Sequence, residues 1–301
     1  MKLISYGPAG QERPGVLLDK DVILDLDLAS QGEIRTIRQL LEQGEAGWRR
    51  VADWIAGGPP DRWLRPAEGV RLGPPVTNPS KIVCVGLNYR SHAEEQKARF
   101  PERPLLFSKA VTSLAGDGDP IWYPVEEEHV DYEAELAFVI GRPAFRVRQE
   151  DWEAYVAGYT IVDDISARDA QWADRKWFRG KSYDSFCPMG PCVVTRDEVP
   201  DPHALRLTAT LNGDLRQDGH TSDLIFSIPE ILAFASRNIT FLPGDVIATG
   251  TPCGVGIFRD PPACMKPGDA ISVSLENVGT LTNHVRERTE EIFSVYPAPR
   301  L

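Results

Sequence analysis

From residue 81 onward the sequence is dominated by short β-rich segments that Gly and Pro turns separate. These segments are "KIVCVG" (81–86), "PLLFSKA" (104–110), "GYTIVDDIS" (158–166), "LRLTATLNG" (205–213), "DVIATG" (245–250) and "AISVSLENVG" (270–279). Short runs of β-branched and aromatic residues between turn residues are typical of strands. The spacing matches neither alternating βαβ units nor a repeat array. We therefore expect an α+β chain that is mostly β.

Two helical interruptions are expected in this β-rich part. In "SIPEILAFASRN" (227–238), Ser227 followed by Glu230 predicts a capping box, and Pro229 lies in the first turn. In "QEDWEAYVAG" (149–158), Gly158 would end a second helix before the next strand begins.

Residues 1–75 have a different pattern. Short strand-like pieces (15–19 and 21–26) are followed by two amphipathic helical candidates (33–44 and 47–58). A Pro- and Gly-rich stretch then extends to residue 80 and indicates a boundary. A chain of 301 residues with 42% hydrophobic residues is long enough for two cores. We predict a small N-terminal α/β domain (1–75) and a catalytic domain (80–301).

The charge of the chain limits its partners. A formal net charge of -11 and a pI near 5.0 argue against nucleic acid and anionic membrane surfaces, which select for basic patches. A small anionic metabolite stays possible where a local site is positive. No apolar stretch is long enough to span a bilayer, and the first ten residues lack the apolar segment of a signal peptide, so we expect the cytoplasm. The five scattered cysteines contain no Cys-x-x-Cys pair, which favours reduced thiols.

Alternating carboxylates mark the segment "VDYEAELAFVIG" (130–141). The apolar run after Glu135 and the closing Gly141 favour a strand, and side chains two apart on a strand share a face. Asp131, Glu133 and Glu135 would then repel one another unless something positive lies among them. Three candidates remain open: a Lys or Arg cluster, a metal ion, or plain solvent.

A second strand ends in Asp163 and Asp164, at the end of "GYTIVDDIS". Carboxylates from two strands suit a hard divalent cation, which prefers oxygen ligands, so Mg²⁺ or Mn²⁺ fits better than Zn²⁺. The histidines have no His-x-x-x-His spacing, which also disfavours zinc. An exposed acidic strand face is the alternative interpretation.

Other polar residues are candidates for catalysis and substrate binding. In "GLNYRSHAEEQ" (86–96), His92 and Glu95 would share a helix face, where the carboxylate could orient the imidazole as a general base; a surface or cap role is the alternative. The remaining candidates offer donors to an anion, with surface cations or an ordinary turn as the alternatives. They are Arg168 and Gln171 in "SARDAQ", Lys181 in "RGKSYDSFCPMGP", and Thr251 in "DVIATGTPCGVG".

The order of six motifs over residues 80–290 resembles the fumarylacetoacetate hydrolase family, in its bacterial two-domain type. The motifs are "CVGLNYRSHAEE", "VDYEAELAFVIG", "GYTIVDDISARDAQ", "GKSYDSFCPMGP", "NGDLRQDGHTSDLIFSIPEI" and "GDVIATGTPCGVG". The resemblance implies a β-roll catalytic domain that forms a homodimer. It also implies three sets of site residues: metal ligands for Mg²⁺ or Mn²⁺ (Glu133, Glu135, Asp164), catalytic residues (His92, Glu95, Lys181) and substrate-binding residues (Arg168, Gln171, Thr251).

The function that the resemblance implies is metal-dependent enolate chemistry on a small anionic 2-oxo acid. We expect a hydrolase that cleaves a C–C bond in 2,4-diketo acids, such as an acylpyruvate or a fumarylacetoacetate-like substrate. An oxaloacetate-type decarboxylase or a keto-enol tautomerase on the same site is the alternative, and a non-catalytic scaffold is a third hypothesis. Trp172, Trp177 and Phe178 would either line the substrate pocket or belong to the core.

Overall fold

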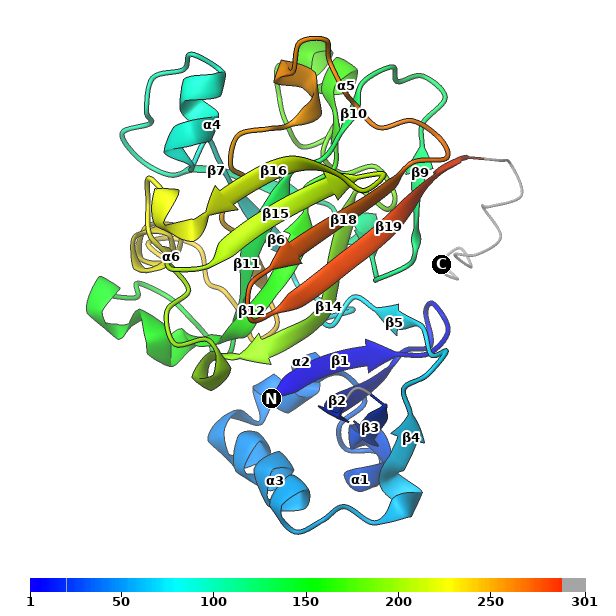
Figure 1. The fold of residues 1–301 in the computed structure, drawn as a ribbon. Helices are drawn as coiled ribbons and strands as arrows, with labels where there is room; N and C mark the ends of the chain where they lie inside the picture. The colour runs from blue at the N-terminus through cyan, green and yellow to red at the C-terminus, as the bar shows by residue number, and fades with distance from the viewer. Residues whose placement is uncertain (20, 289–301) are drawn as a thin grey trace, which may run out of the picture.

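The computed structural model describes residues 1–19 and 21–288 (Figure 1). The predicted catalytic domain, 80–301, therefore reaches beyond the described residues at its C-terminal end. The fold is mostly β, as the sequence predicts. The described strands form a twelve-stranded sheet, a five-stranded sheet and a two-stranded ribbon.

The twelve-stranded sheet runs through the whole molecule. In spatial order its strands are β4 (Leu64–Pro66), β3 (Val22–Asp25), β2 (Arg13–Asp19), β1 (Lys2–Tyr6), β14 (Cys187–Thr195), β12 (Val156–Asp163), β11 (Ala134–Ile140), β17 (Val246–Ala248), β6 (Ile82–Gly86) and β7 (Leu105–Lys109), while β5 (Leu72–Gly73) pairs with β1 and β8 (Leu114–Ala115) with β14. Every residue of β11 and β12 is buried, because both faces of these strands are covered. Along β11, Leu136 and Phe138 face one apolar core and Ala137 and Val139 face the other.

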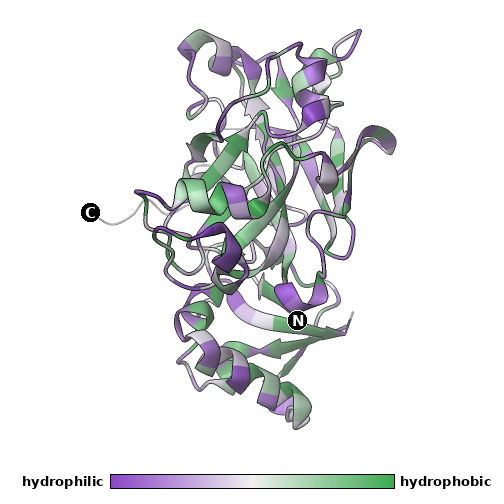
Figure 2. Ribbon diagram, turned by 90° about the vertical axis from the view of Figure 1, so that its left-hand side faces the viewer, coloured by the Kyte–Doolittle hydropathy of each residue, from purple (hydrophilic) through white to green (hydrophobic). Residues whose placement is uncertain are grey.

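The five-stranded sheet covers one face of the large sheet. Its strands are β16 (Asp214–His220), β15 (Arg206–Leu211), β18 (Ala270–Leu275), β19 (Gly279–Glu287) and β9 (Pro120–Tyr123). Burial alternates along β15 and β18, so one face contributes to the core and the other is more exposed. The two-stranded ribbon consists of β10 (Val130–Asp131) and β13 (Ser166–Ala167), which pair antiparallel with each other. Figure 2 shows the apolar strands inside and more polar loops outside.

The N-terminal part extends the large sheet and does not stand apart from it. Lys2 and Leu3 of β1 pair with Val194 and Val193 of β14. The helices α1 (Leu26–Ala29), α2 (Ile37–Glu42) and α3 (Gly44–Ala56) lie at the lower end of the molecule in Figure 1. Helix α2 is shorter than the helix predicted over 33–44, whereas α3 begins three residues before the segment predicted over 47–58 and ends two residues before its end. The division into domains 1–75 and 80–301 stays a prediction.

The remaining helices are α4 (Arg90–Glu95), α5 (Arg168–Asp174) and α6 (Ile228–Ala235), with 3₁₀ turns η1 (Asp61–Trp63), η2 (Val111–Ser113), η3 (Gln149–Tyr155), η4 (Arg196–Glu198), η5 (Thr221–Asp223) and η6 (Gly256–Phe258). Helix α6 has the predicted capping box of Ser227 and Glu230. The helix predicted over 149–158 forms as the 3₁₀ helix η3, but its predicted end at Gly158 is wrong, because η3 ends at Tyr155 and Gly158 belongs to β12. A Cβ at Gly158 would lie 2.2 Å from the carbonyl oxygen of Val194, so close strand pairing explains this glycine. No helix among the described residues is long and apolar enough to cross a membrane.

Candidate active site

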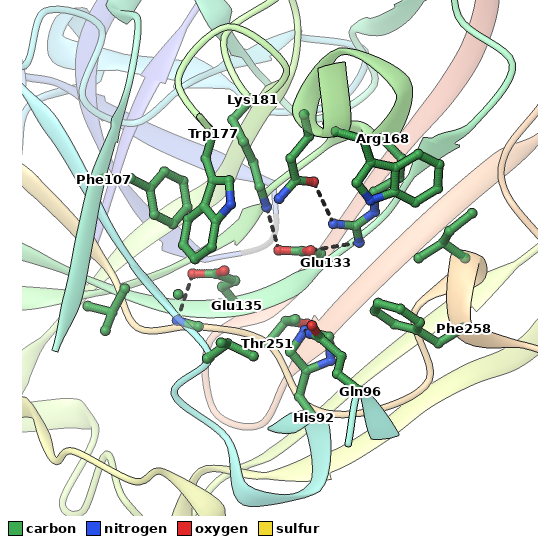
Figure 3. A pocket seen from close by; sticks show the side chains of 17 residues that line it. His92, Gln96, Phe107, Glu133, Glu135, Arg168, Trp177, Lys181, Thr251 and Phe258 are labelled. Carbon is green, nitrogen blue, oxygen red and sulfur yellow. Dashed lines mark hydrogen bonds and ion pairs between the residues drawn. The ribbon is translucent and has the colours of Figure 1, made fainter. Parts of the chain in front are cut away.

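Most of the predicted site residues line one cavity of about 110 Å³ (Figure 3). Seven of the nine line it, namely His92, Glu133, Glu135, Arg168, Gln171, Lys181 and Thr251. The other two contact residues of the lining: Glu95 binds His92, and Asp164 binds Lys181. The structure therefore brings the whole predicted set together, although its members come from segments as far apart as residues 92 and 251.

Three buried carboxylates form a candidate metal site beside this cavity. One ligand oxygen from each of Glu133, Glu135 and Asp164 lies within 4.8 Å of the others. Glu135 lies in β11, Glu133 just before it, and Asp164 just after β12, so the antiparallel pairing of these strands brings the carboxylates together. The exposed acidic face that the sequence left open is excluded, because all three are buried.

The strand predicted over 130–141 is interrupted before Ala134. Asp131 pairs in the separate ribbon β10–β13, and the sheet pairing of β11 begins only at Ala134. At the break, side chains replace sheet partners: the N–H of Tyr132 donates to Asp131, and the N–H of Glu133 donates to Asp163 at 2.9 Å. Asp131 and Asp163 are both buried, so the solvent-facing alternative is wrong for them.

Buried cations lie among the carboxylates, which was one of the three options open at the sequence level. Nζ of Lys181 lies 2.7 Å from Glu133 Oε2 and 2.7 Å from Asp164 Oδ2. Nη2 of Arg168 lies 2.7 Å from Glu133 Oε1, and Lys109 donates to Asp164 Oδ1. Figure 3 shows Glu133 held between Arg168 and Lys181.

These cations do not balance the buried negative charge. The described site contains five buried carboxyl groups (Asp131, Glu133, Glu135, Asp163, Asp164) and three buried cations (Lys109, Arg168, Lys181). Full ionisation would therefore leave two uncompensated negative charges, which is costly in a buried site. A divalent cation has the charge that removes this excess, and the all-oxygen donor set suits Mg²⁺ or Mn²⁺.

The surroundings shift the pKa values of the two glutamates in opposite directions. Burial raises the pKa of Glu135 well above its usual range, and the negative Asp164 and Glu133 raise it further. Burial would also raise the pKa of Glu133, but Lys181 and Arg168 outweigh it and lower the value to about 2. Of these two glutamates, Glu135 is therefore the one whose negative charge the protein's own cations do not compensate.

Arg168 is held rigidly at the cavity wall. Its Nε and Nη2 donate to Asp131 Oδ2 at 3.0 and 2.7 Å, and its Nη1 donates to Gln171 Oε1 at 3.1 Å. Asp131 is itself held by the N–H of Gly256 at 2.6 Å. Arg168 is 5% exposed, which excludes a role as a surface cation. Gln171 lines the cavity as well.

The glycine-rich loop after β17 supports Glu135 and positions Thr251. The N–H of Gly250 donates to Glu135 Oε2 at 2.8 Å, so it binds a protein carboxylate and not the predicted substrate anion. Gly250 has φ +100°, and a Cβ there would lie 2.9 Å from Val85 O, so glycine is required. Thr251 Oγ1 accepts from Gln217 Nε2 at 2.8 Å, which leaves its hydroxyl hydrogen free to donate.

His92 and Glu95 of α4 form the predicted pair. His92 Nδ1 lies 3.1 Å from Glu95 Oε2, while Glu95 Oε1 accepts the N–H of Gly254 at 2.9 Å. Because an ionised carboxylate only accepts, Nδ1 carries the hydrogen, and the lone pair of the neutral imidazole is on Nε2. Figure 3 shows this ring on the side of the cavity opposite Lys181. The arrangement suits a general base.

Several residues of the site were missed at the sequence level. They are Lys109, Gln96, Gln217, Phe107 and Phe258. Lys109 had a readable signal, because a lysine stands within the apolar segment "PLLFSKA". The structure shows that this lysine is buried. The two tryptophans whose role was left open, Trp172 and Trp177, both line the cavity, whereas Phe178 is not among its lining residues.

Comparison with known proteins places these features in context. A family model described as fumarylacetoacetate (FAA) hydrolase C-terminal matches residues 81–286. The chain is 39% identical to the mitochondrial oxaloacetate tautomerase Fahd2a of Rattus norvegicus, over 95% of this chain and 91% of the rat protein. It is 40% identical to the oxaloacetate tautomerase YisK of Bacillus subtilis (strain 168), over 90% and 95%. The crystal structure of maleylpyruvate hydrolase from Sphingobium sp. SYK-6 in complex with manganese(II) and pyruvate is similar with a TM-score of 0.79 and 31% identity, over 96% of this chain and 100% of the other.

Proposed function

Because the chain belongs to the fumarylacetoacetate hydrolase family, we propose that it catalyses the keto-enol tautomerisation of oxaloacetate. The observation that carries the proposal is the presence, around one cavity, of the His92–Glu95 pair and the three-carboxylate cluster. Two relatives of about 40% identity that match nine tenths or more of the chain are oxaloacetate tautomerases. The C–C hydrolysis that we expected first thus becomes the second candidate, and its alternative becomes the first.

The residues that would hold a cation are Glu133, Glu135 and Asp164. The donor set fits Mg²⁺ or Mn²⁺, and manganese is present in the maleylpyruvate hydrolase structure. When bound, such a cation supplies Lewis-acid polarisation of the 2-oxo acid.

Tautomerisation requires a proton to leave carbon 3 and a proton to reach the oxygen on carbon 2. His92 would take the first proton on Nε2, and Glu95 would stabilise the resulting imidazolium through Nδ1–H. The Lys181 ammonium has three hydrogens and donates two of them in hydrogen bonds to Glu133 and Asp164. The third would donate a hydrogen bond to the substrate oxygen and stabilise the negative charge that develops there.

The remaining polar groups would bind the substrate carboxylates. Arg168 has a free Nη1 hydrogen beside Gln171, and Thr251 has a free hydroxyl hydrogen. All three residues line the cavity, and each is fixed by a partner inside the protein. A fixed donor costs little reorganisation when the substrate binds. We therefore propose a small anionic 2-oxo acid as the substrate.

Hydrolysis of a C–C bond remains a second candidate because of the similarity to maleylpyruvate hydrolase. The same His92 nitrogen could take a proton from a water that attacks carbon 4 of a diketo acid. The two functions differ in whether water reaches that nitrogen. A homodimer, the cytoplasmic location and the lack of nucleic-acid or membrane partners stay predictions.

The deciding experiment follows oxaloacetate by proton NMR with purified, manganese-loaded protein. We expect enol-to-keto conversion far above the uncatalysed rate, lost after EDTA treatment and in Glu133→Gln. Acylpyruvates in parallel samples test hydrolysis through the release of pyruvate and a carboxylic acid. Conversion of oxaloacetate at the uncatalysed rate, together with rapid cleavage of an acylpyruvate, would overturn the tautomerase proposal in favour of the hydrolase.

A further inference from the structure

The side-chain amide of Gln96 lies directly against the candidate base. Its Nε2 is 2.6 Å from Nε2 of His92, and Gln96 lines the cavity beside the ring (Figure 3). The backbone of Gln96 is fixed as well, since its N–H donates to His92 O at 3.2 Å at the C-terminal end of α4. The contact therefore joins two residues four apart on the same helical turn.

The geometry decides the direction of this hydrogen bond. Glu95 accepts a hydrogen bond from Nδ1–H of His92. The other ring nitrogen, Nε2, therefore carries the lone pair and accepts a hydrogen bond from an N–H of the Gln96 amide. At 2.6 Å between the nitrogens, no water molecule fits between them. The lone pair that would make His92 a base is thus covered in the free protein.

An apolar side chain flanks the same imidazole. The ring of Phe258 lies 6.2 Å from the ring of His92, measured between centroids, and it forms part of the cavity wall. Of the three groups around the imidazole, Glu95 holds Nδ1, Gln96 covers Nε2 and Phe258 borders the ring. A water molecule must therefore displace the Gln96 amide before it can give a proton to His92.

We propose that Gln96 directs this site toward tautomerisation and away from C–C hydrolysis by excluding water from His92. The inference rests on the proposed function. Hydrolysis needs a water oxygen to bond to carbon 4 while Nε2 takes its proton and the C3–C4 electron pair stays on carbon 3. Tautomerisation needs only the carbon 3 proton to move to Nε2, after which the enolate oxygen takes a proton from solvent and the imidazolium returns its proton to solvent. A substrate held in the cavity competes with the amide at high effective concentration, whereas a single water does not.

The test uses Gln96→Ala, with Gln96→Met as a second variant that keeps the side-chain length without the amide. Glu94→Ala is the matched control, because Glu94 is an exposed residue of the same helix. The first readout is the ratio of acylpyruvate hydrolysis to oxaloacetate tautomerisation. The second is acylation of His92 by diethyl pyrocarbonate in metal-free protein, quantified by mass spectrometry, which requires no turnover.

We expect His92 labelling and the hydrolysis-to-tautomerisation ratio each to rise about fivefold to tenfold in Gln96→Ala, less in Gln96→Met, and not in the control. Unchanged labelling would show that Gln96 does not cover the nitrogen. Increased labelling with an unchanged ratio would show that the cover does not direct the reaction, and either result overturns the inference. Failure of the wild-type protein to tautomerise oxaloacetate is a separate result that overturns the proposed function itself, while the labelling still reports whether Gln96 covers His92.

Discussion

Tyr183 donates its hydroxyl hydrogen to Oε1 of the buried Glu127 at 2.9 Å. The other carboxylate oxygen, Oε2, accepts the N–H of Ala170 at 3.3 Å. Ala170 lies in α5, which carries two of the proposed substrate-binding residues, and Tyr183 lies two residues after Lys181. Glu127 therefore joins the two segments that bring positive charge to the cavity, although it is not among the residues that line it.

This relationship predicts a positioning role for Glu127. In Glu127→Ala, the buried N–H of Ala170 and the half-buried hydroxyl of Tyr183 lose their acceptor, which costs about 1–3 kcal/mol. We expect a lower melting temperature and an increase of about tenfold in KM, with a smaller change in kcat, because substrate binding depends on where α5 lies. Tyr183→Phe should show the same changes at a smaller size. Glu126→Ala is the control, because Glu126 is exposed. If Glu127→Ala is destabilised but its KM is unchanged, Glu127 contributes to stability alone.

A second prediction concerns the fit between Gly86 and Trp177. A Cβ on Gly86 would lie 2.1 Å from the Trp177 ring, which packs edge-on against Phe107 at 5.1 Å between centroids. Both aromatic rings line the cavity. In Gly86→Ala the indole must move, so we expect kcat/KM to fall about tenfold and the tryptophan fluorescence to change, with the fold retained.

A double-mutant cycle isolates the cause of this effect. If displacement of the indole is responsible, Gly86→Ala should cost little more in a Trp177→Ala background. The same tenfold loss in both backgrounds would mean that Gly86 matters for another reason. The measurement is kcat/KM of the wild-type protein, the two single variants and the double variant, and it decides whether the indole is the cause.

Sequence patterns predicted the parts of the site whose residues lie close together in the chain. Glu133 and Glu135 could be assigned to one site because alternation along an extended chain puts them on one side, and His92 and Glu95 because one helical turn separates them. The contact of Lys109 with Asp164 could not be predicted in this way, because it depends on how β7 is placed across the three strands that separate it from β12. Local patterns do not contain such long-range pairings.

Two elements differ from their predicted extent, and the physical reason is similar in both. The pattern over 149–158 suits a helix, but sheet pairing of Val156 with Ile140 extends β12 into it. The alternating carboxylates also predicted an unbroken strand at 130–141. In the structure the strand breaks where the side chains of Asp131 and Asp163 accept hydrogen bonds from backbone N–H groups. In both cases tertiary contacts overrode local preference.

A third prediction concerns the role of Glu135 in metal binding. Glu135→Gln keeps the shape of the side chain but removes its negative charge, and it leaves Glu133 and Asp164 in place. We expect the affinity for Mn²⁺, measured by EPR titration, to fall at least about a hundredfold, since losing a direct ligand should cost no less than losing a supporting one. Glu126→Gln, at an exposed position, should bind Mn²⁺ like the wild-type protein. Equal affinities in the two variants would exclude Glu135 from the metal site.

The last prediction concerns the dependence of stability on pH through His203. Its Nε2 accepts the N–H of Ile228, the first residue of α6, at 3.1 Å, so this contact requires the neutral imidazole. Burial lowers the pKa of His203, while the nearby Asp201 and Glu230 act in the opposite direction without cancelling the effect.

The sign of the effect follows from that lowered pKa. The unfolded chain, with a histidine pKa of about 6.5, binds the proton before the folded one does. The contribution of His203 is therefore fully present above about pH 6.5 and is lost as the pH falls through the folded-state value. Urea unfolding at pH 7.5 and 5.5 should show a smaller loss of stability on acidification in His203→Gln, whose amide oxygen can still accept the Ile228 N–H, than in the wild-type protein. Equal losses in the two proteins would mean that His203 does not contribute to the pH dependence.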